Sequence, residues 1–235
     1  MSTVAIPAEE IHPALWRASQ LAHGRGKTVD TGYAVLSTEL PGDGWPLGEL
    51  VDLLVEQPGV GEMRLLGPAL NLLNARPIAL VRPPHIPDGP GFDHIGLSLD
   101  RLLQIKAPKM TDALWAAEQI LRAGSCAAVL LWAEHAKASS LRRLHLAAQS
   151  SETLFIMVRP LVAIQESSPA SLRLALRPAA EGLTVEIVKR RGPIRTEPLS
   201  ISLQPTPVLY SRHARLARRP LAEVVTRGVP AEVAV

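Results

Sequence analysis

The chain has little of two things that often reveal a protein's class: cysteine and long apolar runs. Cys126 is the one cysteine among 235 residues, which excludes an intrachain disulfide and a CxxC metal motif. No apolar run reaches the roughly 18 residues that a membrane-spanning helix needs. Near the N-terminus, Glu9 and Glu10 stand where a secretion signal would have a basic stretch. We therefore expect a soluble, cytoplasmic protein that has no membrane partner.

The composition that remains is that of a folded domain with an uneven charge. Hydrophobic residues make up 47% of the chain, and 21 of its residues are proline. Residues 1–172 hold 14 Lys and Arg against 17 Asp and Glu, whereas residues 173–235 hold 11 against 5. A neutral-to-acidic body followed by a basic segment indicates an interaction surface, without identifying its partner. The seven histidines lack metal-ligand spacing, so we expect no metal site.

Short apolar runs alternate with amphipathic stretches along the middle of the chain. Strands are predicted over residues 49–55, 77–81, 126–132 and 153–158, and helices over 62–73, 111–122 and about 139–149. From Leu172 the apolar period becomes two, which is typical of antiparallel strands. The pattern predicts an α/β fold: a mostly parallel sheet flanked by helices, then a C-terminal antiparallel hairpin and a basic tail. Gly67-Pro68 predicts a kink or a break in the first of these helices.

The turn after the first strand is where such a fold would bind a nucleotide. A working phosphate loop reads G-x-x-x-x-G-K-[ST], in which the lysine contacts phosphate and the hydroxyl holds Mg²⁺. When Gly61 is aligned with the second glycine, Glu56 takes the first position, Glu62 the lysine and Met63 the hydroxyl, with Gly59 inside the turn. A carboxylate in place of the lysine repels polyphosphate, so the loop is predicted to be degenerate. An ordinary helix start, where an acid favours the positive end of the dipole, also accounts for Glu62 and Met63.

Several runs carry a family resemblance. Residues 46–54 with 59–63 resemble the approach to the phosphate loop of RecA-type recombinases, and residues 97–103, 111–118 and 127–132 look like the stretch that leads into their Walker B strand. The stronger match is to the ImuA family of bacterial translesion-synthesis-associated proteins, which is related to RecA and SulA. It spans roughly residues 10–205, and its most specific runs are WPLGEL (45–50), ALWAAE (113–118) and FIMVRP (155–160).

This resemblance implies an organisation and a role. Residues 1–30 would be an N-terminal helix and linker, residues 31–204 a RecA-like core, and residues 205–235 a basic, Pro/Arg-rich tail. By resemblance, the protein would assist damage-induced (SOS) translesion synthesis and mutagenesis through contacts with an ImuB-like polymerase-family protein, with RecA as a further candidate partner. A SulA-like inhibitor of cell division that binds FtsZ is an alternative, because SulA shares the helix–strand core.

The departures from a working RecA argue against catalysis. Trp132 stands where the Walker B strand would end in an acid, and Pro83-Pro84 where the family's catalytic glutamate should be. Met157-Val158-Arg159 replaces the Asn-Gln that senses nucleotide. Together with the degenerate phosphate loop, these positions predict a pseudo-ATPase with no cofactor and no catalytic residue. The two DNA-binding loops of RecA also look shortened or deleted.

Candidate partner-binding residues lie toward the two ends of the chain. They are Trp16 in the predicted N-terminal helix and the tail arginines Arg212, Arg215, Arg218 and Arg219, which a helix would gather largely on one face. A solvated basic face and a binding surface for DNA or an acidic protein patch explain these arginines equally well, so a DNA-binding module that acts through the tail is a further alternative. Trp115 and Trp132 fit core positions. The oligomeric state stays open.

Overall fold

The computed structural model of the chain describes residues 26–73, 75–86, 89–193 and 195–203. Its strands are β1 (Thr28–Val29), β2 (Trp45–Pro46), β3 (Leu50–Val55), β4 (Ile78–Val81), β5 (Leu102–Ile105), β6 (Ala128–Trp132), β7 (Leu154–Pro160), β8 (Leu172–Ala179), β9 (Gly182–Lys189) and β10 (Leu199–Ser202). Its α-helices are α3 (Ala34–Ser37), α4 (Glu62–Leu72), α5 (Gly89–His94), α6 (Met110–Ala123) and α7 (Ala138–Ala148). Short 3₁₀ turns are η1 (Pro41–Asp43), η2 (Leu99–Arg101) and η3 (Leu161–Gln165).

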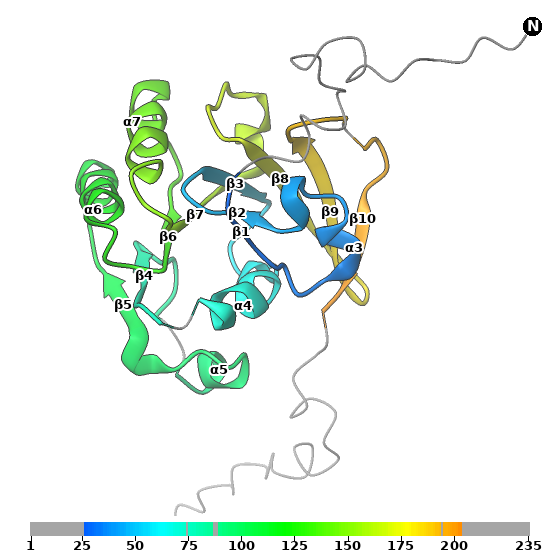
Figure 1. Ribbon diagram of the computed structural model, residues 1–235, viewed down its shortest axis with the longest axis horizontal. Helices are drawn as coiled ribbons and strands as arrows, with labels where there is room; N and C mark the ends of the chain where they lie inside the picture. Colours follow the sequence, from blue (N-terminus) through cyan, green and yellow to red (C-terminus); the bar gives the residue numbers. More distant parts are fainter. Residues whose placement is uncertain (1–25, 74, 87–88, 194, 204–235) are drawn as a thin grey trace, which may run out of the picture. The chain divides into compact units, whose positions relative to one another are not determined.

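An eight-stranded sheet organises the described residues, in the order β10-β9-β8-β3-β7-β6-β4-β5 (Figure 1). The strands from β8 through β3, β7, β6 and β4 to β5 pair in parallel, while β9 and β10 add antiparallel strands beyond β8. Every residue of β3, β4 and β6 is buried, as expected for parallel strands that are covered on both faces. The predicted α/β fold with a C-terminal antiparallel hairpin is confirmed.

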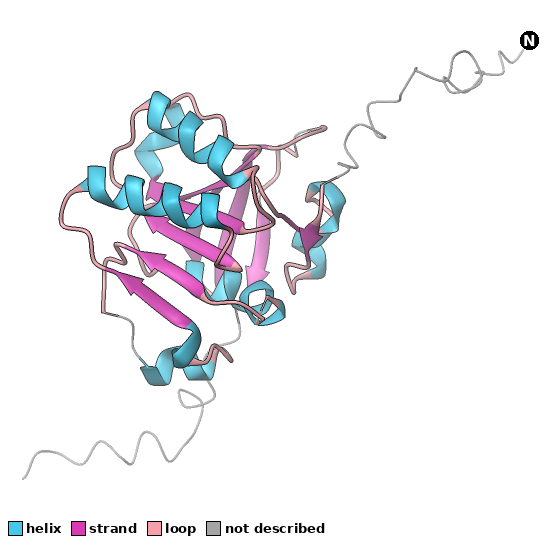
Figure 2. Cartoon of the chain, turned by 60° about the vertical axis from the view of Figure 1, so that its left-hand side comes forward, coloured by secondary structure: helices cyan, strands magenta, loops and turns pink. Residues whose placement is uncertain are grey.

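Alternate side chains of the central strands feed two separate cores. Val51 and Leu53 of β3 join Leu66 of α4 in one apolar cluster. On the opposite face, Leu50 of β3 and Phe155 of β7 join side chains from α6 and α7. Figures 1 and 2 show helices on the two sides of the sheet, with α6 and α7 next to each other. The alternation of side chains along these buried strands therefore determines which helix covers which face.

A kink or a break was predicted at Gly67-Pro68, and the break is wrong, because α4 continues through Pro68. A proline inside a helix lacks the N–H that would bond to the carbonyl four residues earlier, here that of Arg64. The hydroxyl of Tyr33 donates to that carbonyl oxygen at 3.1 Å. Gly32, at φ 79°, passes so close to Pro68 that an added Cβ would lie 2.3 Å from the Pro68 Cβ. The 28–46 segment thus packs onto the proline and supplies the missing hydrogen bond.

One strand of the eight-stranded sheet was missing from the sequence prediction. Strand β5 forms the outer edge of the sheet beside β4. It is only four residues long and Leu103 is exposed, so it lacks the continuous apolar run that marked the inner strands. A short, partly polar edge strand is a usual way to limit unwanted pairing at the end of a sheet.

A histidine joins α7 to the central strand. The Leu50 N–H at the start of β3 donates to Nδ1 of His145 at 3.4 Å. Burial lowers the pKa of His145, opposed by the nearby Glu49 carboxylate and reinforced by the charges of Lys189 and Arg191. An Nδ1 that accepts this bond must be unprotonated, so the bond depends on a neutral ring.

We expect acid to weaken the fold at this contact. Because the folded-state pKa of His145 lies below its ordinary value of 6.5, its contribution to stability is complete above about pH 6.5 and is lost as the pH falls through the folded-state pKa. In urea unfolding at a series of pH values, His145→Asn should lose less stability than wild type between pH 7.5 and pH 5, since the asparagine carbonyl accepts the same bond and does not titrate. Parallel pH profiles would contradict this role.

Candidate functional site at the carboxyl edge of the sheet

The turn between β3 and α4 has the position of a phosphate loop. Strand β3 ends at Val55 and α4 begins at Glu62, so the turn lies at the carboxyl edge of the parallel strands, where this class of fold binds its ligands. Gly59 and Gly61 have φ values of 91° and 131°, which residues with a Cβ rarely adopt. A Cβ on Gly61 would also lie 2.9 Å from Leu203 Cδ1. The turn therefore keeps glycines at two positions that need them.

The carboxylate of Glu62 fills the anion position of this turn. The Gly59 N–H donates to Oε1 at 2.8 Å and to Oε2 at 3.0 Å, and the Gly61 N–H donates to Oε2 at 3.2 Å. Glu62 is the first residue of α4 and only 2% exposed. These are the kinds of backbone donors that phosphate oxygens use at a helix N-terminus. The protein's own carboxylate therefore occupies donors that a phosphate would need.

Two other side chains of the predicted loop, those of Glu56 and Met63, also contact other parts of the protein. Glu56 accepts a hydrogen bond from Arg177 Nη1 of β8 at 2.6 Å, which links the start of the turn to the adjacent strand. Met63 packs against the apolar cluster on the α4 face of the sheet. Of the five residues of the predicted degenerate loop, two are glycines that shape the turn, and Glu56, Glu62 and Met63 each have an intramolecular contact.

Beside the turn lies a cavity of about 460 Å³. Its walls come from the ends of β3, β4, β6 and β7 and from the segments that follow them: Val55, Glu56, Pro58, Arg82, Pro83, Pro84, Trp132, Ala133, Glu134, Val158, Arg159 and Pro160. The volume lies in the range of ligand pockets. The lining thus brings together three sets of sequence-predicted positions, Pro83-Pro84, Trp132 and Val158-Arg159, with the start of the phosphate-loop turn.

Arg82 has an unusual backbone in this lining. Its φ is 53°, in the left-handed region that residues with a Cβ seldom enter. The Arg82 N–H donates to the Ile105 carbonyl oxygen at 2.9 Å, which holds the backbone to the end of β5. Its guanidinium forms an ion pair with the exposed Glu134 at 3.5 Å. Such outliers persist only where the surrounding structure enforces them, and they concentrate at functional sites.

A buried ionic cluster joins the three neighbouring strands β3, β7 and β8. Asp52 of β3 pairs through Oδ2 with Nε of Arg173 on β8 at 3.2 Å and with Nη1 of Arg159 on β7 at 3.7 Å. Burial raises the pKa of Asp52, against the opposing contact with Ser168 and the two arginine charges. Arg159 also pairs with the partly exposed Glu166.

The second arginine of the cluster holds the segment that follows β7. Arg173 Nη2 and Nη1 donate to the carbonyl oxygens of Ala163 at 2.7 Å and Ile164 at 3.3 Å. Both carbonyls belong to η3. Burying a charge is costly unless it is paired, so the cluster ties η3 to β3, β7 and β8 as one unit. Sequence reasoning missed it, although a charged residue inside each of three apolar strands was a visible signal.

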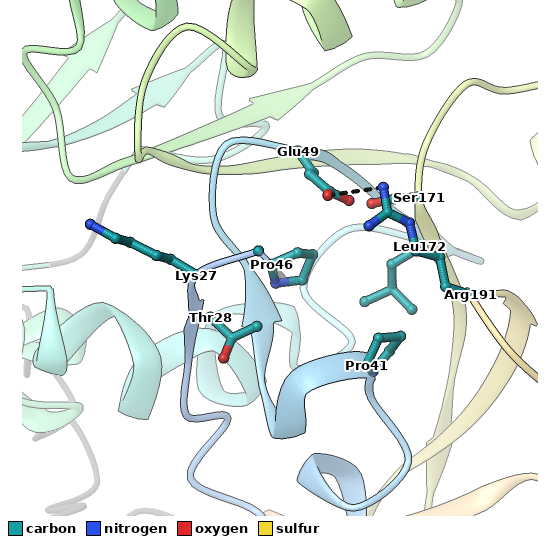
Figure 3. A pocket seen from close by; sticks show the side chains of 9 residues that line it. Lys27, Thr28, Pro41, Pro46, Glu49, Ser171, Leu172 and Arg191 are labelled. Atoms are coloured by element: carbon teal, nitrogen blue, oxygen red, sulfur yellow. Dashed lines mark ion pairs between the residues drawn. The ribbon is translucent and has the colours of Figure 1, made fainter. Parts of the chain in front are cut away.

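A second hollow, shown in Figure 3, is too small for an organic ligand. Its volume is about 20 Å³, which has room for roughly one water molecule. Glu49 and Arg191 form an ion pair across its wall at 3.3 Å. The larger cavity at the carboxyl edge is therefore the better candidate for a ligand.

Several predicted site residues fall outside this edge. Trp16 and the tail arginines Arg212, Arg215, Arg218 and Arg219 lie outside the described residues. Trp132 is buried, as expected, but the core position predicted for Trp115 is wrong, since Trp115 is 61% exposed. Helix α6 turns Ala113, Ala117 and Leu121 toward the sheet, and the helical period then directs Trp115 away from it.

The described residues contain neither a candidate metal-binding cluster nor a candidate membrane-spanning helix. No group of three or more His, Cys, Asp or Glu side chains within them is arranged to hold a metal ion. No helix in this part of the chain has the length and apolar character needed to cross a membrane. Cys126 is buried in the strand region, where burial raises the pKa of its thiol, so it behaves as a small apolar side chain.

We expect Glu62→Ala to destabilise the protein and to create a weak anion site. Hydrogen bonds to a charged group contribute about 1.5–3 kcal/mol, so the free energy of unfolding should fall by about 2 kcal/mol. Because the Gly59 and Gly61 amides would then be free, inorganic phosphate should restore part of the loss, as measured by urea unfolding with and without phosphate.

Glu56→Ala is the matched control for this experiment. It removes a carboxylate from the same turn, but one that is half exposed and paired on the surface, so the expected loss is only about 0–1 kcal/mol. It leaves the Glu62 contacts in place and should show no specific response to phosphate. Equal phosphate effects on wild type and on both variants would contradict the role of Glu62 as an internal anion.

Solved structures that resemble this chain include SulA, whereas family models and curated proteins give no match. No family model matches the sequence, and no curated protein matches it. Among solved structures, SulA from Pseudomonas aeruginosa is similar to this chain with a TM-score of 0.40 and 26% sequence identity. The matched region covers 47% of this chain and 97% of the SulA chain.

Proposed function

We propose that this chain is a non-catalytic, RecA-like accessory protein of damage-induced translesion synthesis, and that it acts through protein contacts. The observation that supports the non-catalytic part of this proposal is that the Glu62 carboxylate accepts hydrogen bonds from the N–H groups of Gly59 and Gly61. The resemblance of residues 10–205 to the ImuA family supplies the biological setting. An ImuB-like polymerase-family protein is the proposed partner, with RecA as a second candidate.

Three features of the carboxyl edge oppose nucleotide hydrolysis. Glu62 brings a negative charge and occupies the loop amides, so a polyphosphate would meet repulsion and lack donors. Met63 offers a thioether in place of a hydroxyl, which hard Mg²⁺ does not favour as a ligand. Strand β6 ends in the buried indole of Trp132 rather than in an acid. Each change removes a different requirement of phosphoryl transfer, so a single compensating substitution would not restore it.

Exposed apolar side chains support a role in protein contacts. Ile86 is 82% exposed and Val162 is 76% exposed, and each follows a segment that lines the cavity. Trp115 is exposed on α6, beside a shallow hollow between α6 and α7. Aromatic and apolar side chains gathered near hollows are typical of binding surfaces. Two of these exposed side chains thus follow the lining of the carboxyl-edge cavity, next to a turn that lacks the lysine and hydroxyl of a working phosphate loop.

The non-catalytic part predicts no response to nucleotide. Purified full-length protein should keep its melting temperature within about 1 °C when millimolar ATP and Mg²⁺ are added, because a ligand stabilises a protein only in proportion to its binding. A RecA-type ATPase measured in parallel provides the positive control. A clear upward shift, or release of phosphate above background, would sink the pseudo-ATPase proposal.

The biological part predicts a mutagenesis phenotype. Deleting the gene should reduce ultraviolet-induced mutation toward the level in undamaged cells, and a plasmid copy of the wild-type gene should restore it. Copies of the gene that encode Glu62→Ala and Glu56→Ala, expressed at matched protein levels, distinguish the effect of lost stability from the effect of a changed carboxyl edge. If overexpression instead produces filamentous cells while the mutation frequency is unchanged, the protein is a division inhibitor and the translesion role fails.

A further inference from the structure

The cavity beside the closed phosphate-loop turn has an apolar body. Pro58, Pro83, Pro84 and Pro160 form much of its wall, together with Trp132, which is 8% exposed and whose buried indole N–H has no hydrogen-bond partner among the described residues. Prolines have no N–H group to satisfy, so these walls present apolar surface at little polar cost. A ligand that fills the cavity would gain mainly from burying an apolar group.

Two other charged groups in the lining are linked to neighbouring elements. Glu56 accepts a hydrogen bond from Arg177 of β8 at 2.6 Å. The fully buried Arg159 pairs with Asp52 at 3.7 Å and with Glu166, while its Nε and Nη1 have no hydrogen-bond partner among the described residues. Both residues thus connect the lining to neighbouring strands and to the end of η3.

Arg82 is the exception among the cationic residues of the lining. Its recorded ion-pair partner in the described part of the chain is Glu134, at 3.5 Å, and the Glu134 side chain is 70% exposed. An exposed pair of this kind contributes about 0–1 kcal/mol. A guanidinium can form two parallel bonds with a carboxylate, so an incoming carboxylate could displace Glu134 at little cost. The strained backbone of Arg82, held by its bond to Ile105, fixes the position from which the side chain extends.

Two exposed apolar side chains, the rim residues, follow segments that line the cavity. Ile86 lies two residues after Pro84, and Val162 lies two residues after Pro160. Both side chains are more than three-quarters exposed. A small molecule in the cavity would leave this rim uncovered, whereas an extended polypeptide would cover the cavity and the rim together.

We propose that this cavity is a docking site for an extended segment of a partner protein that carries an apolar side chain next to an acidic one. The apolar side chain enters between Trp132 and the prolines, the carboxylate pairs with Arg82, and the flanking residues lie over Ile86 and Val162. This rests on the proposed function only in assuming that the chain acts through protein contacts. It deepens that proposal by naming the surface and the chemistry of the partner.

The probe is a phage-displayed library of random twelve-residue peptides, selected on full-length wild-type protein. Enriched peptides should combine acidic and large apolar residues. Synthetic, fluorescein-labelled copies, measured by fluorescence polarisation, should bind Arg82→Gly about tenfold more weakly, which corresponds to about 1.4 kcal/mol. Glycine suits a φ of 53°, so this variant removes the guanidinium without adding strain. Ile86→Ser and Val162→Ser should each weaken binding severalfold, and added salt should weaken binding to wild type more than to Arg82→Gly.

Two matched controls test whether these losses are local. Arg122→Gln removes an exposed arginine on α6, and Leu146→Ser removes an exposed leucine on α7; both should bind as wild type does. Failure to enrich peptides, or enriched peptides that bind Arg82→Gly and the rim variants unchanged, would overturn the proposal. So would equally tight binding of N-acetyl-leucine alone, which would identify a small-molecule site. None of these results bears on the response to ATP or on mutagenesis, so this inference and the proposed function fail separately.

Discussion

The bond between the Glu62 carboxylate and the turn that precedes it is the constraint on which the functional edge depends. In a phosphate-binding turn, the backbone donors are left for a ligand, and the turn changes as the ligand comes and goes. Here the donors of Gly59 and Gly61 are satisfied from within. The turn therefore has the same partner with or without a ligand. The start of α4 is thereby joined to the turn that follows β3.

Fixing that turn shapes the cavity beside it. Glu56 and Pro58 of the turn form one wall, and the segments after β4, β6 and β7 form the others. The ionic cluster of Asp52 holds β3, β7 and β8 in register and also holds η3 through Arg173. The Glu62 contacts and the Asp52 cluster are both centred on carboxylates that are buried in the protein. Consequently the edge is held on two sides, and of the two arginines in the cavity lining only Arg82 is partly exposed and paired with an exposed acid.

The sequence allowed the inner sheet to be predicted because β3, β4, β6 and β7 are short apolar runs of the right length. Prediction from the sequence was less accurate wherever the structure depends on contacts between residues that are far apart in the chain. The continuation of α4 through Pro68 depends on Tyr33, which lies 31 residues from Arg64. Strand β5 has no periodic signal of its own, and the exposure of Trp115 depends on the phase of α6 against the sheet. The substitutions in the phosphate-loop turn could be identified from the sequence. The hydrogen bonds of Glu62 and the cavity could not, because they depend on how the folded segments pack together.

A protein that loses nucleotide chemistry still has a carboxyl edge, because parallel strands that end together leave a crevice whatever residues line it. In a working ATPase, that crevice must accommodate charge, metal and water. Under the proposed function, those requirements would lapse once Glu62 satisfies the turn, and prolines and a tryptophan could line the edge without harming a reaction. The substitutions that would remove phosphate and Mg²⁺ ligands are then the same ones that make the crevice apolar. Under that proposal, loss of one ligand class and suitability for a polypeptide would be two consequences of one change in lining, in which Arg82 would receive an acidic group.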